Sequence, residues 1–111
     1  RGPKLDSVLV ARPASMVELL ISSAAELEYA EALNWYANRD IYTAEGFDAE
    51  FDLAIQTIFE DPDRFPRCDE SHHFYLMRRF PYQLIFRKTT DHWVVIAVAH
   101  TSRKPRFWAD R

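Results

Sequence analysis

The stretch from Arg78 to Trp108 constrains the fold more than any other part of the chain. Two runs of β-branched and aromatic residues, separated by a short polar turn at 89–91, predict a β-hairpin. The second run, Val94 to Ala99, is apolar at nearly every position, which predicts a strand buried on both faces or nearly so. The chain then becomes abruptly basic. A rigid strand that delivers His and Arg side chains to its own end is a candidate functional site.

The rest of the chain predicts an α+β domain with a helical hairpin packed on a small, mainly antiparallel sheet, in the order β-α-α-β-β-β. Ser23-Ala24-Ala25-Glu26 matches a capping box that opens the first helix. The second helix stops at Asp61-Pro62, because proline cannot continue it. The elements predicted before the hairpin are a strand at 17–21, helices at about 23–38 and 43–60, and a strand at 73–77.

Each predicted helix has one apolar face, which we expect to form the core. Glu28 and the other helix carboxylates are expected on solvent faces, where no two of them mark an acid–base pair. Leu27 and Trp35 lie on the polar side of the first helix, where they would either pack on the next helix or form an exposed contact for a partner. The predicted core residues are Ala25, Tyr29, Ala32, Leu33 and Tyr36 in the first helix and Phe47, Phe51, Ala54, Ile55 and Ile58 in the second.

A single globular domain is expected at residues 16–111. Residues 1–15 lack clear periodicity, which predicts an N-terminal extension or a tag remnant, with Met16 as the native start. Cys68 is the single cysteine, so an internal disulfide is impossible and a reducing, cytoplasmic setting is favoured. No apolar run reaches the length of a membrane span. The two glycines exclude a Gly-rich phosphate loop, and we expect no cofactor.

Charge is divided unevenly along the chain. Residues 16–71 carry three basic and fourteen acidic side chains, a net charge of −11, whereas residues 72–111 carry eight basic and two acidic ones, a net charge of +6. This asymmetry predicts a molecule with an acidic face and a basic face. The basic face could meet nucleic acid or an acidic protein, and charge alone leaves both open.

The basic residues of the hairpin and of the segment after it form the leading candidate site. One face of the hairpin could gather guanidinium groups suited to phosphate or carboxylate. The alternative is a solvated sheet edge, where Lys and Arg discourage strand addition. His100 is either a general acid or base, or a structural side chain that hydrogen-bonds the turn. The basic side chains concerned are Arg78, Arg79, Arg87, Lys88, Arg103, Lys104 and Arg106.

Two further groups of residues have simpler interpretations. Phe107 and Trp108 could stack on a nucleic-acid base, but closing the core is the favoured role for such a terminal pair. Residues 68–73 superficially resemble a metal site, because they include Cys68 and two adjacent histidines. Adjacent strand residues point to opposite faces, and no second ligand pair has metal spacing. We therefore expect a surface loop there and no metal.

The order of elements and three sequence patches resemble the ParE/RelE superfamily, the toxin components of bacterial type II toxin–antitoxin modules. The resemblance covers about residues 16–111, nearly the whole domain. The patches are Ser-Ser-Ala-Ala-Glu-Leu opening the helix that holds Trp35-Tyr36, then Arg79-Phe80-Pro81-Tyr82 entering a strand, and Ala97-Val98-Ala99-His100 followed by Arg103, Pro105 and Trp108.

The resemblance implies a growth-inhibiting toxin that a cognate antitoxin holds inactive, with oligomers formed mainly through the antitoxin complex. Members that resemble ParE poison DNA gyrase, whereas members that resemble RelE cut messenger RNA on the ribosome. In a metal-independent endoribonuclease, His100, Arg103 and Arg79 would be the catalytic residues. The residues that would bind the target or a phosphate are Arg78, Arg87, Lys88, Lys104, Arg106 and Trp108.

Two departures from RelE-like enzymes favour the ParE-like function. RelE-like enzymes carry a Lys and Arg cluster and usually a functional Tyr near the C-terminus, where this chain has Phe107 and Trp108. The domain is also acidic overall, which suits ribosomal RNA poorly. We therefore expect a ParE-like toxin that inhibits an essential target such as DNA gyrase. The alternatives are a RelE-like ribosome-dependent endonuclease and a non-toxic antitoxin-binding module.

Overall fold

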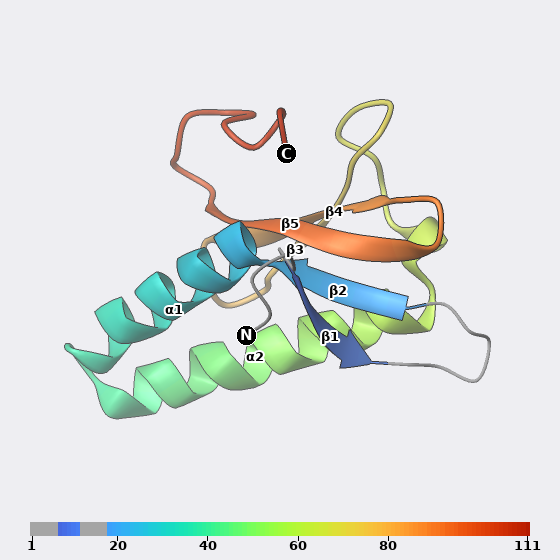
Figure 1. Ribbon diagram of the computed structural model, residues 1–111. Helices are drawn as coiled ribbons and strands as arrows, with labels where there is room; N and C mark the ends of the chain where they lie inside the picture. The colour runs from blue at the N-terminus through green and yellow to red at the C-terminus, as the bar shows by residue number, and fades with distance from the viewer. Residues whose placement is uncertain (1–6, 12–17) are drawn as a thin grey trace.

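The computed structural model describes residues 7–11 and 18–111. Two helices lie on one side of a single sheet, and the segment after the last strand lies on the other side (Figure 1). The elements are β1 (Ser7–Ala11), β2 (Glu18–Ser22), α1 (Ser23–Ala37), α2 (Ile41–Glu60), the short 3-10 helix η1 (Pro62–Arg64), β3 (His73–Leu76), β4 (Tyr82–Lys88) and β5 (His92–His100). Among the described residues, neither helix is both long and apolar enough to cross a membrane.

The five strands form one mixed sheet in the order β1-β2-β5-β4-β3. The predicted hairpin is β4 and β5, which are antiparallel with Leu84 opposite Val98 and Tyr82 opposite His100. β2 runs parallel to β5, so the chain passes from one to the other through both helices and the β3–β4 pair. The α+β fold class and the order β-α-α-β-β-β from β2 onward are confirmed.

The sheet contains one strand that the sequence analysis placed in the extension. β1 pairs antiparallel with β2, from Ser7 opposite Ser22 to Ala11 opposite Leu19, with one irregularity after Leu9. The expected native start, Met16, lies outside the described residues. The division of the chain into an extension and a domain therefore stays a prediction.

The helices begin at residues that differ slightly from those predicted. Ser22, not Ser23, caps α1, because β2 runs directly into the helix and the extended backbone that a cap requires falls on its last residue. The Oγ of Ser22 accepts a hydrogen bond from the N–H of Ala25 at 3.1 Å. α2 begins at Ile41, two residues earlier than predicted, with the Asp40 side chain as its cap. It ends at Glu60 as predicted.

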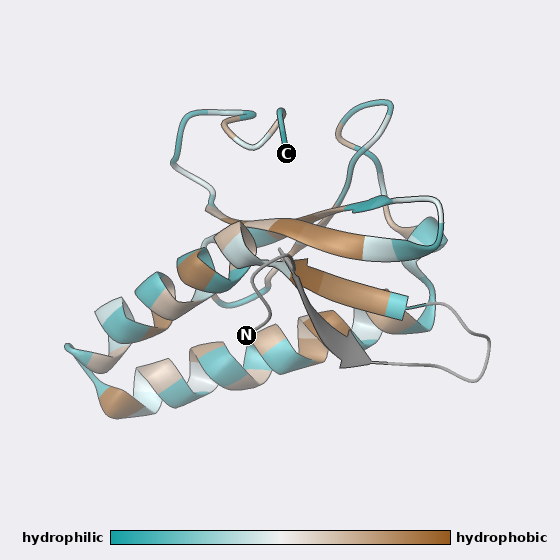
Figure 2. Ribbon diagram, viewed as in Figure 1, coloured by the Kyte–Doolittle hydropathy of each residue, from teal (hydrophilic) through white to brown (hydrophobic). Residues whose placement is uncertain are grey.

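The core between the helices and the sheet confirms the predicted apolar faces. All of the predicted core residues are buried or pack against this cluster. Figure 2 shows hydrophobic residues as brown segments along β2 and β5 and at intervals along both helices. The largest fully buried side chains of this layer are Phe47 and Ile58 from α2, Leu19 from β2, Leu84 and Phe86 from β4, and Val95 and Val98 from β5.

A second apolar cluster lies on the opposite face of the sheet. Every residue of β5 from Trp93 to Ala99 is buried, which confirms the prediction of a strand covered on both faces. The outer cluster includes Ile85, Ile96 and Trp108, and Trp108 is only 4% exposed. The predicted role of the Phe107–Trp108 pair in closing the core is therefore confirmed for Trp108, with Phe107 packed beside it.

A buried carboxylate holds the turn between β3 and β4. Glu50 of α2 is 6% exposed and accepts hydrogen bonds from the backbone N–H groups of Arg78 and Arg79. The Nε of Arg79 lies 3.4 Å from the same carboxylate. A buried carboxylate is stable only when such donors compensate it. Glu50 therefore ties α2 to this turn.

We expect Glu50→Ala to lower the free energy of unfolding by about 2 kcal/mol, since it removes the charged acceptor of two partly buried backbone hydrogen bonds. Urea denaturation followed by circular dichroism measures this change. Glu45→Ala is the matched control on the same helix, because Glu45 is exposed, and it should change stability by less than about 0.5 kcal/mol. Equal effects of the two substitutions would contradict the role of Glu50.

Asp69 joins the loop before β3 to the segment after β5. Its carboxylate accepts hydrogen bonds from the N–H groups of Ser71 (2.8 Å) and His72 (2.7 Å) and from the guanidinium of Arg106 (2.9 Å), and lies 3.0 Å from Nδ1 of His72. Desolvation opposes ionisation of this group, but the hydrogen bonds outweigh it and hold the pKa of Asp69 well below its usual range.

This lowered pKa predicts a pH dependence of stability. Because the pKa of Asp69 is lower in the folded chain than in the unfolded chain, its stabilising effect is complete above about pH 4 and is lost as the pH falls through the folded-state pKa. Below about pH 4, the wild-type free energy of unfolding should fall more steeply than that of Asp69→Asn. Denaturant titrations between pH 7 and pH 2 test this, and parallel profiles would refute it.

Candidate functional site

A groove lies between α1 and the β4–β5 hairpin, at the end of β5 where the chain becomes basic. Its volume is about 540 Å³, and its lining combines aromatic and apolar side chains with a few charged groups. We call it the α1 groove. The residues that line it are Glu28, Glu31, Ala32, Trp35, Tyr36, Pro81, Tyr82, Val98, His100 and Arg103. Two of the three predicted catalytic residues therefore lie in the same groove.

His100 is positioned by the turn that follows β5. Its Nδ1 accepts a hydrogen bond from the N–H of Ser102 at 3.0 Å and lies 2.7 Å from the Ser102 Oγ. The ring of Tyr82 meets the imidazole edge-on, with 5.0 Å between ring centroids. Because Nδ1 accepts from a backbone donor, the neutral ring carries its proton on Nε2. The structure thus shows the second of the two roles predicted for His100, a side chain that hydrogen-bonds the turn. Its Nε2 atom is the ring nitrogen that remains for a ligand.

Glu28 is a largely buried carboxylate in the groove lining, and its predicted position on a solvent face is wrong. Its side chain is 10% exposed and accepts a hydrogen bond from the N–H of Val98 at 2.9 Å. β2 pairs with β5 only as far as Val95, so this N–H has no strand partner on that side. Arg111 binds the carboxylate at 3.0 Å, and Arg103 lies 3.5 Å from it.

Arg103 contacts two side chains close to the groove, Glu28 and Phe107. In addition to Glu28, its guanidinium lies over the ring of Phe107, 3.6 Å from the centroid. Its side chain is still 51% exposed at the rim of the groove. It could therefore contact a partner, and it shares the Glu28 carboxylate with Arg111, which lies closer to it.

The wall of the groove on α1 is aromatic. Trp35 is 51% exposed, its ring meets Tyr36 edge-on, and the guanidinium of Arg39 covers one face 3.6 Å from the centroid. Leu27 is 60% exposed, so neither it nor Trp35 is buried against α2. The pKa of Tyr36 is raised by burial, and that of Tyr82 by burial and by Tyr36. Both hydroxyls are therefore protonated at neutral pH.

Arg78 and Arg79 lie in a different cleft. This cleft has a volume of about 950 Å³ and lies between α2, the loop after η1 and β3. Arg79 is turned towards α2 by Glu50 and by the carbonyl oxygen of Gly46, 3.4 Å from its NH2 group. The structure therefore brings His100 and Arg103 together but does not bring Arg79 to them.

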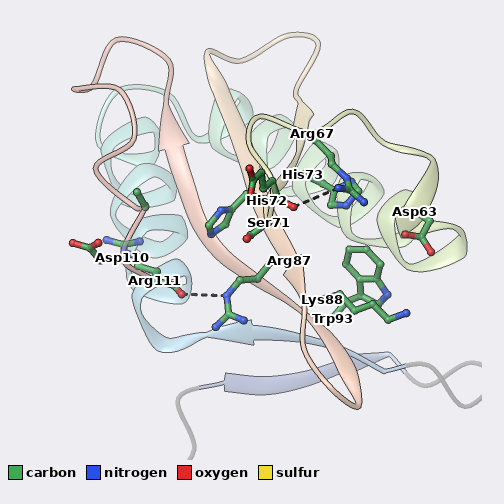
Figure 3. Close-up of a pocket in the computed structure, with 12 residues that line it drawn as sticks. Asp63, Arg67, Ser71, His72, His73, Arg87, Lys88, Trp93, Asp110 and Arg111 are labelled. Atoms are coloured by element: carbon green, nitrogen blue, oxygen red, sulfur yellow. Dashed lines mark hydrogen bonds between the residues drawn. The ribbon is translucent and has the colours of Figure 1, made fainter.

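The other predicted binding residues are also dispersed. Arg87 and Lys88 line a third cavity, where the Nε of Arg87 donates to the carbonyl oxygen of Arg111 at 3.1 Å (Figure 3). Arg106 is paired with Asp69, and Lys104 is exposed. Trp108 is buried with its ring 4.9 Å from that of His72, which leaves no face for a nucleic-acid base to stack on.

Sequence reasoning missed two kinds of groove residue. No local sequence pattern indicates that Glu28 lines the groove, because the groups that donate hydrogen bonds to it are 70 and more residues away along the chain. Tyr36 and Tyr82 lie within the patches that carried the family resemblance, and that resemblance was the signal that could have selected them. Within residues 18–111, no group of three or more His, Cys, Asp and Glu side chains is arranged to hold a metal ion.

The comparisons with known proteins agree with the architecture. The chain matches the family model described as the ParE toxin of the type II toxin–antitoxin system parDE over residues 19–105. A solved structure of the chromosomal ParDE toxin–antitoxin system from P. aeruginosa has a TM-score of 0.71 and 12% sequence identity, and covers 80% of this chain and 100% of that chain. At this identity the likeness shows the fold. No curated protein matches the chain in sequence. The chain belongs to the ParE toxin family of type II toxin–antitoxin systems.

Proposed function

We propose that the chain is a growth-inhibiting toxin of the bacterial cytoplasm that acts by binding an essential target such as DNA gyrase. A cognate antitoxin neutralises it. Membership of the ParE toxin family supports the class of activity. The α1 groove supports the mode of action, because it presents aromatic surface and a small number of oriented polar groups, as binding sites for proteins do.

The dispersal of the cationic residues is the observation that carries this proposal. Cleavage of RNA by its own 2′-hydroxyl requires a base, an acid and cations that converge on one phosphate. In the α1 groove, Nδ1 of His100 is held by Ser102, and Arg103 is shared with Glu28. Arg79 lines a separate cleft. The geometry therefore favours binding over nucleolytic chemistry.

The same groove is the surface on which we expect the antitoxin to act. Trp35 and Leu27 are large apolar side chains that α1 leaves exposed, and Trp35 forms part of the groove wall. Exposed aromatic residues of this kind anchor protein partners. An antitoxin segment that covers Trp35 and the rim at Arg103 would block the groove and neutralise the toxin.

We expect induced expression of the full chain in a bacterial host, followed by pulse labelling, to reduce DNA synthesis before protein synthesis and to produce filamentous cells. His100→Ala should at most weaken this effect and not abolish it, because His100 is one of ten groove residues and binding needs no proton transfer at the imidazole. Phe47→Asp is the control that should abolish it, since a charge at this fully buried position prevents folding.

Two other outcomes would overturn the proposal. An early fall of protein synthesis, with messenger RNA cleavage that His100→Ala or Arg103→Ala abolishes, would identify the RelE-like endonuclease instead. Normal growth during expression of the soluble, folded chain without an antitoxin would identify a non-toxic antitoxin-binding module.

A further inference from the structure

β3 lies at an edge of the sheet, and part of its outer edge is open. Among the described residues, β4 is its only neighbour in the sheet. The N–H of Phe74 donates outward, to the carbonyl oxygen of Pro66 at 3.1 Å. The N–H of Met77, directly after the strand, donates the other way, to the carbonyl oxygen of Tyr82 in β4. Backbone groups alternate between the two edges of a strand, so the N–H and the carbonyl of Leu76 point outward.

The outward groups of Leu76 are not protected against a further strand. Within the described residues, no hydrogen bond outside the ladder with β4 involves the backbone of Leu76. The four residues of β3, His-Phe-Tyr-Leu, include no Lys, Arg or Pro, which are the residues that usually protect an edge. The side chain of Leu76 is 57% exposed. An edge of this kind is a template for an added strand.

The open edge borders the cleft of about 950 Å³ between α2 and β3, which we call the β3 cleft. Its lining includes four large apolar or aromatic side chains, those of Leu53, Phe65, Tyr75 and Leu76. Leu53 of α2 is 60% exposed, so the fold leaves two large leucines uncovered at the same cleft. Apolar surface beside an open strand edge is typical of a site that binds an extended peptide.

The β3 cleft has an excess of positive charge. Three arginines line it, against the single carboxylate of Glu50, which is 6% exposed and already bonded to the turn and to Arg79. Arg64 and Arg78 are exposed, and among the described residues no carboxylate lies within 4.0 Å of their charged nitrogens. The guanidinium of Arg64 lies over the ring of Phe65, 4.7 Å from its centroid. This charge is complementary to an acidic partner.

We propose that β3 binds an extended, acidic segment of a protein partner as an added strand. The segment exchanges backbone hydrogen bonds with the outward N–H and carbonyl of Leu76. Its apolar side chains rest in the β3 cleft against Leu53 and Phe65, and a carboxylate of the segment binds Arg78. A strand edge favours a protein over a nucleic acid, because only a peptide can continue the ladder. The β3 cleft is separate from the α1 groove, so this interaction does not require the proposed function to hold.

Isothermal titration calorimetry of the full chain with an acetylated and amidated peptide in which valine and glutamate alternate tests the proposal. We expect saturable binding, and binding at least about tenfold weaker for the matched peptide with lysine in place of glutamate. Arg78→Gln should weaken binding about tenfold, since it removes a charge-assisted contact but keeps the backbone N–H that Glu50 holds. Arg39→Gln is the matched control, because Arg39 is an exposed arginine outside the cleft lining, and it should leave binding unchanged.

Two substitutions of Leu76 distinguish strand addition from binding through side chains alone. Leu76→Pro removes the outward N–H and no hydrogen bond of the ladder with β4, so it should abolish binding while circular dichroism shows that the fold is kept. Leu76→Ala keeps the N–H and should bind the peptide with lower affinity. In a ¹⁵N-labelled wild-type chain, the Leu76 amide should shift and exchange more slowly with solvent when the peptide is bound. This measurement keeps the test valid even if Leu76→Pro fails to fold.

Several outcomes would overturn the proposal. They are the absence of saturable binding of the glutamate peptide, equal binding of the lysine peptide, and shift changes confined to the α1 groove. A folded Leu76→Pro variant that binds as tightly as the wild type would show that side chains alone hold the peptide. Arg78-dependent binding of a short RNA, tighter than that of the peptide, would identify a nucleic-acid surface instead.

Discussion

The burial of β5 on both faces is the constraint on which the rest of the structure depends. A strand that is apolar from Trp93 to Ala99 needs cover on each side of the sheet. The helices supply one cover, and the segment after β5 folds back to supply the other through Trp108. The second of these arrangements brings the basic end of the chain against the sheet. The positions of Arg103, Arg106 and Arg111 are therefore a consequence of how β5 is covered.

Hydrogen-bonded carboxylates determine which cationic side chains remain available to a partner. Glu28, Glu50 and Asp69 come from the acidic half of the chain, and each accepts hydrogen bonds from residues of the basic half. Part of the opposite net charge of the two halves is thus used in contacts within the fold, where charge-assisted hydrogen bonds join the two halves of the chain. Arg103, Arg106 and Arg111 serve these contacts, whereas Arg87 and Lys88 do not.

The fold could be predicted from local patterns. The apolar run of β5, the stripe of Phe47 and Ile58 on α2, and the proline after Asp61 each act over a few residues, and each prediction is confirmed. The cap of α1 was misplaced by one residue, because the end of β2 decides which serine is extended. The pairing of β1 with β2 was not predicted, since residues 7–11 show no strand periodicity that would distinguish them from an extension.

The candidate sites could not be assembled from the sequence, for a physical reason. Adjacent charges along a chain, such as Arg78 and Arg79 or Arg87 and Lys88, look like one basic cluster with His100 and Arg103. Their separation is set by a turn and a sheet edge, which assign them to three different cavities. A nuclease needs such groups to converge on one phosphate, whereas a binding protein can use each surface separately. The dispersal of cations over the fold therefore supports the proposal of a toxin that works through contact surfaces.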